Sequence, residues 1–126
     1  LVPIEMNPLR YGGFGLADLT YHAFGFNPFN AFFSNFKPNW HEIWDKRNEN
    51  HFGWVLGYNG TDINVEIHTP DDKAYLHFLG ETIHYVEIDY KENPVFSIAY
   101  IKDSCPKSLQ RLLKTEFNDF FVPIKS

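Results

Sequence analysis

The spacing of the large apolar residues changes near residue 50, and this change constrains the fold more than any other feature. Between residues 28 and 47 these side chains recur every three or four positions, which is the period of an amphipathic helix. Between residues 52 and 67 they alternate with polar or small residues, which is the period of a strand. The chain therefore predicts an α+β fold, with short helices before an antiparallel sheet.

Helix signals begin at residue 27. Asn27 can cap a helix, and Pro28 suits its first position. Four phenylalanines then fall on one helical face: Phe29, Phe32, Phe33 and Phe36. We predict short helices over residues 27–47. Residues 1–26, rich in glycine and aromatics, predict a lead-in that is mostly loop, with one helical turn within 16–24.

The Asn59-Gly60 pair lies between the two alternating runs and is the strongest short-range signal for a hairpin. A two-residue turn at this point would pair Leu56 with Ile63, and it would gather the large apolar side chains on one face. The sequence therefore predicts a hairpin built from residues 52–58 and 61–67.

The rest of the chain predicts three more strands and a C-terminal helix. The strands are expected over residues 74–79, 82–90 and 95–101, and the helix over 104–121. A chain of 126 residues fits a single domain, here 1–126. We predict a five-stranded antiparallel meander over 51–102 with the amphipathic helix packed on it. This element order resembles helix-grip and cone-like α+β cups, a resemblance of topology that implies a pocket.

Charge and cysteine content exclude several classes of protein. Eleven basic against sixteen acidic side chains give a net charge of −5, which argues against nucleic acid as a partner. No apolar run is long enough to span a membrane. The single cysteine, Cys105, allows no internal disulfide and suits a reducing cytoplasm. We expect a cytoplasmic protein without nucleic-acid or membrane partners.

Catalytic and metal-binding motifs give little support for an enzyme. The six histidines include no His-Glu-x-x-His pair, and we expect no metal and no cofactor. Cys105 precedes a predicted helix, where a thiol can become nucleophilic, but a small residue in a capping turn explains it more simply. The sequence therefore favours binding over catalysis, with hydrolysis a third alternative.

Acidic residues on the expected meander suggest a protein-binding surface. Acidic side chains with aromatic neighbours can attract a basic protein and hold it tightly. The predicted partner-binding residues are Asp71, Asp72, Glu81, Glu87, Asp89, Glu92 and Tyr85. Our first hypothesis is an inhibitor or immunity-type protein, an antitoxin, that neutralises a basic toxin or nuclease. A leftover aromatic patch would equally allow a homodimer.

The alternative hypothesis is a cup for a small apolar ligand. Alternation of side chains along the predicted strands places His77 opposite His84, on the same face as Trp54 and Tyr75. These four residues would be the few polar and aromatic contacts of an apolar pocket.

Overall fold

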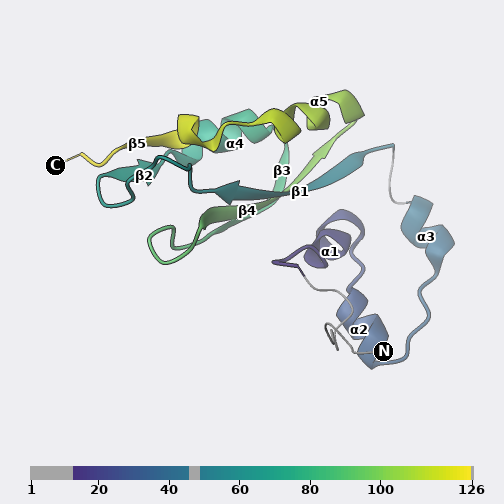
Figure 1. Cartoon of the computed structure of the whole chain (residues 1–126). Coiled ribbons are helices and arrows are strands. Elements are labelled where there is room, and N and C mark those ends of the chain that lie inside the picture. Colours follow the sequence, from purple (N-terminus) through teal and green to yellow (C-terminus); the bar gives the residue numbers. More distant parts are fainter. Residues whose placement is uncertain (1–12, 46–48, 126) are drawn as a thin grey trace, which may run out of the picture.

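The computed structural model describes residues 13–45 and 49–125 of the chain (Figure 1). Residues 1–12 of the expected lead-in lie outside the described residues. The elements in chain order are α1 (Asp18–Phe24), α2 (Pro28–Phe33), α3 (Trp40–Asp45), β1 (His51–Tyr58), β2 (His68–Pro70), α4 (Asp72–Leu79), β3 (Thr82–Glu87), β4 (Val95–Asp103), α5 (Pro106–Gln110), the 3-10 turns η1 (Arg111–Lys114) and η2 (Phe117–Phe120), and β5 (Phe121–Pro123). Short N-terminal helices, antiparallel strands and a C-terminal helix confirm the α+β class.

The predicted start of the helix after Asn27 is confirmed in α2. The side chain of Asn27 accepts a hydrogen bond from the backbone N–H of Asn30 at 3.0 Å, and Pro28 occupies the first turn of α2. α1 ends at Gly25, whose φ of 68° is the left-handed conformation that glycine adopts without strain.

The five strands that the structure describes form two sheets, so the prediction of one continuous meander is wrong. The larger sheet has the order β1-β4-β3, and β2 pairs with β5 in a second sheet. The expected antiparallel pair formed by the last two strands of the meander is confirmed as β3 and β4, with His84 opposite Tyr100. β1 occupies the other side of β4, where Trp54 also lies opposite Tyr100.

The predicted hairpin at Asn59-Gly60 is also wrong, because these two residues serve tertiary packing. The side-chain amide of Asn59 donates to the carbonyls of Tyr90 and Asn93, at 2.7 and 2.8 Å. Gly60 lies against Asn118 so closely that a Cβ atom would overlap its side chain. The pair therefore anchors the end of β1 to the β3–β4 turn instead of reversing the chain into a second strand.

Residues 74–79, predicted as a strand, belong to helix α4. The carboxylate of Asp71 caps this helix by accepting the N–H of Ala74 at 3.0 Å. Tyr75 and Leu79 lie one helical turn apart and are both buried, while Gly80 follows the last residue. Five of the six residues in this segment are apolar, so its pattern did not discriminate strand from helix.

The C-terminal helix is shorter than predicted, although it packs on the sheet as expected. α5 covers five residues, and two 3-10 turns continue the chain to β5. Thr115 adopts an extended conformation that interrupts the helical path. Leu109, Leu112 and Phe117 nevertheless pack against the core, because their spacing keeps them on one side.

Helices lie on both faces of the larger sheet. α4 and α5 lie on one face and α1 on the other, while α2 and α3 lie further out beyond α1 (Figure 1). The main core fills the α4–α5 face and consists of Tyr75, Leu79, Phe96, Ala99, Ile101, Phe120 and Phe121. The second face of the sheet is covered by α1.

Candidate functional site

The predicted acidic residues mostly form bonds within the chain. Asp71 caps α4, and the carboxylate of Asp72 accepts a hydrogen bond from the hydroxyl of Tyr85, with 2.5 Å between the two oxygen atoms. Glu81 pairs with Lys102, their charged atoms lying 2.7 Å apart. Each of these carboxylates therefore has a structural role that needs no partner protein.

The remaining acidic residues lie around the β3–β4 connection. The carboxylate of Asp89 accepts the N–H of Lys91 at 3.0 Å and shapes the turn, whereas Glu87 and Glu92 are exposed. Tyr85 is half-buried, and burial together with its bond to Asp72 raises the pKa of its hydroxyl above the ordinary value. Local bonds thus account for Asp71, Asp72, Glu81 and Asp89, four of the six acidic residues.

The four residues of the predicted ligand cup do not converge. Tyr75 is fully buried in the core, where burial raises the pKa of its hydroxyl to about 12. His77 is exposed on α4, so its predicted pairing with His84 is wrong. Trp54 and His84 both lie opposite Tyr100 and share the sheet face that α1 covers.

A histidine that the sequence did not single out completes this second face. The ring of His22 on α1 stacks on the ring of His84, with centroids 4.4 Å apart and planes 17° from parallel. Tyr100 lies beside His22 at 4.4 Å, and its hydroxyl donates to the carbonyl of Gly15 at 2.8 Å. Burial first, and the neighbouring His84 second, lower the pKa of His22, while Asp18 opposes this effect. These contacts dock α1 on the sheet.

The pairing of β4 defines the direction of the main-chain groups of β1. The backbone N–H of Lys102 donates to the carbonyl of Glu81, and the carbonyl of Phe96 accepts the backbone N–H of Ile88. The main-chain groups of even-numbered residues of β4 therefore point toward β3. The odd-numbered residues of β4, such as Ala99, therefore bond toward β1, where they lie opposite odd-numbered residues such as Val55. The N–H and C=O groups of Phe52, Trp54 and Leu56 consequently point away from β4.

We call this line of main-chain groups, over residues 52–56, the outer edge of β1. Within the ranges that the structure describes, no strand pairs with it. β1 is eight residues long and contains no Asp, Glu, Lys, Arg or Pro, the residues with which exposed edges are usually protected. β3, the opposite edge strand, is shorter, carries Glu87 and has an irregular register between Thr82 and His84. Among the strands that the structure describes, β1 is therefore the less protected edge of this sheet, since its own irregular register lies at its end, between Gly57 and Tyr58.

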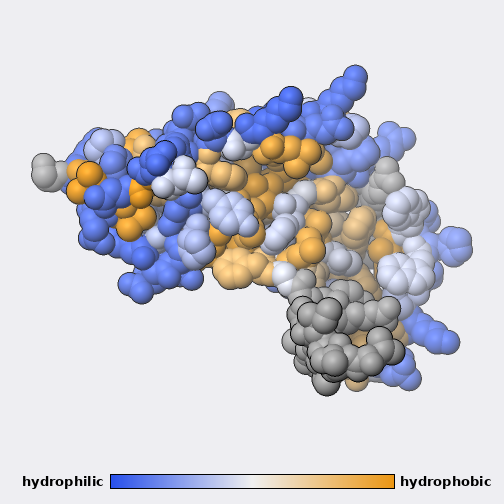
Figure 2. All heavy atoms as spheres, in the orientation of Figure 1, coloured by the Kyte–Doolittle hydropathy of each residue, from blue (hydrophilic) through white to orange (hydrophobic). Residues whose placement is uncertain are grey.

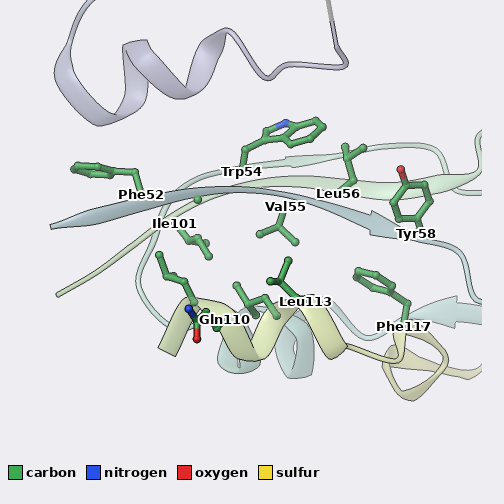
Figure 3. A pocket seen from close by; sticks show the side chains of 12 residues that line it. Phe52, Trp54, Val55, Leu56, Tyr58, Ile101, Gln110, Leu113 and Phe117 are labelled. Atoms are coloured by element: carbon green, nitrogen blue, oxygen red, sulfur yellow. The ribbon is translucent and has the colours of Figure 1, made fainter. Parts of the chain in front are cut away.

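An apolar groove of about 400 Å³ runs beside the outer edge. Both odd-numbered and even-numbered residues of β1 line the groove, so it follows the backbone of the strand. Its other wall comes from α5 and η1, where Leu109, Leu112 and Leu113 contribute. Figure 3 shows Val55 and Ile101 pointing toward α5, while Trp54 and Leu56 point to the opposite side of β1.

The outer edge and its groove lie on an open face of the molecule. Apolar atoms gather across the middle of this face, between the hydrophilic surface over α5 and the region of α1 (Figure 2). Leu113 is 87% exposed on the wall of the groove, and Tyr58 is 49% exposed at its end. An uncharged edge, a groove and exposed apolar side chains thus coincide.

Other chemical sites are weaker. No group of three His, Cys, Asp or Glu side chains among residues 13–45 and 49–125 could hold a metal ion. Cys105 is exposed, and N–H groups of Ser108 and Lys107 lower the pKa of its thiol.

No helix in the described part of the chain is both long enough and apolar enough to cross a bilayer. Comparisons with protein-family models, curated proteins and solved structures find no match.

Proposed function

We propose that the chain is a protein-binding module that pairs an extended protein segment with the outer edge of β1. One observation carries the proposal: this edge is uncharged, unpaired among the described strands and bordered by an apolar groove. In strand addition, the main-chain hydrogen bonds supply affinity and the pockets for alternate side chains supply specificity. The main-chain groups of Phe52, Trp54 and Leu56 are free to form these hydrogen bonds within the described structure, and the groove wall formed by α5 and η1 can receive the side chains.

Net charge supports a basic partner. The charge of −5 would speed the approach of a basic protein through its long-range field, even though most of the predicted acidic residues bond within the chain. An inhibitory or immunity-type role against a basic toxin or nuclease remains part of the proposal. So does a cytoplasmic setting, which suits the exposed thiol of Cys105.

A small apolar ligand is the second candidate, and the groove itself is the reason. Its volume of about 400 Å³ lies in the range of ligand pockets. The contacts would then be Leu109, Leu112 and Phe117 with β1, instead of the cup predicted around His77 and His84.

A displayed library of random peptides tests the first candidate. We expect the wild-type chain to select peptides with apolar residues at alternate positions and with Lys or Arg between them. Leu56→Lys should weaken their binding about tenfold or more, since a charge placed on the edge must be desolvated when a segment pairs with it. The matched control is Val86→Lys, which places the same charge on β3 and should leave binding within about twofold.

Two results would contradict this function. One is a selection in which wild-type and Leu56→Lys chains retain the same peptides with the same affinity. The other is selection of no peptide while an apolar dye binds and is lost on Leu113→Lys, which would favour the small-ligand candidate.

A further inference from the structure

We infer that the segment seated on the outer edge of β1 is β1 of a second copy, so that two chains join as a closed two-fold dimer. The inference rests on the proposed function, because it uses the same edge and names its occupant. Three properties of the strand support self-pairing: its parity, its lack of charge and its place in the sheet.

Parity makes the edge self-complementary. The residues whose main-chain groups point away from β4 are all even-numbered. When two copies pair in antiparallel fashion, even-numbered residues lie opposite even-numbered residues if the two-fold axis passes through Trp54 or through Val55. Residues that face each other point to the same side of a sheet. Large side chains such as Trp54 and Leu56 then meet their counterparts on one face, and Gly53 lies near Val55 of the other copy on the opposite face.

Charge does not oppose this pairing where the strands touch. Because β1 carries no acidic or basic residue apart from His51 at its start, no like charges are set opposite each other. The net charge of −5 on each copy acts across solvent, where it is screened beyond about 10 Å at 0.1 M salt.

The position of β1 at the edge of the sheet limits the assembly to two chains. Pairing gives the strand order β3-β4-β1-β1-β4-β3, in which both outer strands are β3. β3 carries Glu87, a charge that β1 lacks, and its register is irregular between Thr82 and His84, so further edge-to-edge addition is disfavoured. A two-fold contact of this kind is isologous and leaves no β1 edge open. The partner's strand would also enter the groove and cover Leu113.

Sedimentation velocity of the whole chain, with light scattering, tests the inference. We expect twice the 14.8 kDa chain mass at about 100 μM, a concentration that populates a dimer of micromolar Kd. Trp54→Lys and Trp54→Glu should each be monomeric. Their equimolar mixture should dimerise again, because position 54 lies opposite or diagonal to itself in both possible registers. Val86→Lys, the matched control on β3, should remain dimeric.

The outcomes separate this inference from the function beneath it. A wild-type monomer at that concentration, or a Trp54→Lys chain that stays dimeric, overturns self-pairing. If the monomer still selects peptides at β1, the proposed function stands and only the identity of the bound segment is wrong. If it selects none, the proposed function fails too. Rescue by the mixture shows that the single variants fold. If circular dichroism shows them unfolded, Leu56→Lys replaces them and must be monomeric.

Discussion

His22 and His84 join α1 to the sheet through stacked rings, and the charge state of His22 links this contact to pH. Burial and the neighbouring imidazole lower the pKa of His22 from its ordinary value of 6.5. The unfolded chain therefore takes up a proton on His22 at a higher pH than the folded chain does. It follows that the contribution of His22 to stability is fully present above pH 6.5 and is lost as the pH falls below that value.

We predict that the wild-type melting temperature falls more between about pH 8 and about pH 5.5 than that of His22→Gln, by about 2 to 4 °C. Thermal melts of both chains at the two pH values measure this difference. His77→Gln, an exposed histidine on α4, is the control and should behave as wild type. Equal losses in wild type and His22→Gln would show that the stack does not respond to protonation.

Single residues also show why the strongest sequence signal misled. Asn59 and Gly60 have the composition of a tight hairpin turn, yet Asn59 bonds across the fold to Tyr90 and Asn93 and Gly60 accommodates Asn118. These partners are 31 to 58 positions away in sequence. A two-residue preference describes local backbone conformation only, so it could not reveal them.

Helix α4 depends on two acidic residues at its start, and this dependence is testable. Asp71 caps the helix and Asp72 accepts a hydrogen bond from Tyr85. Loss of a cap costs about 1 kcal/mol, and a positive charge at a helix N-terminus adds to that cost. We predict that Asp71→Lys with Asp72→Lys lowers the melting temperature by about 4 °C or more.

The control for this prediction changes the charge by the same amount at exposed positions. Glu87→Lys with Glu92→Lys should alter stability by no more than about 0.5 kcal/mol. An unchanged melting temperature in the Asp71 and Asp72 double variant would mean that these residues are surface charges available to a partner, as the sequence suggested.

Elements defined by neighbouring residues could be predicted, whereas those defined by distant contacts could not. α2 follows from Asn27 and Pro28, and the β3–β4 pair follows from two apolar runs joined by a short turn. α4 was missed although Asp71, Gly80 and the Tyr75 to Leu79 spacing are helix signals, because an equally apolar alternation competed with them. The strand that pairs with β1 is distant in sequence: Val55, for example, lies opposite Ala99, 44 positions later.

The candidate site could be predicted only in part for the same reason. Trp54 was singled out and does lie on β1, but the sequence placed it in a cup with His77 and Tyr75, which α4 carries elsewhere. The lack of charge between residues 51 and 58 was visible in the sequence. Its meaning depends on β1 being an edge strand, and strand order is a property of the whole fold.

At the scale of the whole molecule, the two edges of the sheet have opposite characters. β3 is protected by charge and irregular pairing, while β1 is long, uncharged and beside an apolar groove. A protein that left such an edge uncovered would tend to aggregate. We therefore expect β1 to be covered in the working state, by a second copy or by another protein.

Residue-resolved amide hydrogen exchange of the whole chain tests this claim most directly. Amides of Gly53, Val55 and Gly57, which bond to β4, should be protected at every concentration. Amides of Phe52, Trp54 and Leu56 should exchange rapidly in dilute protein and become protected as concentration rises or a selected peptide is added. Rapid exchange of these three amides under all conditions, or protection at the lowest concentration, would contradict the account.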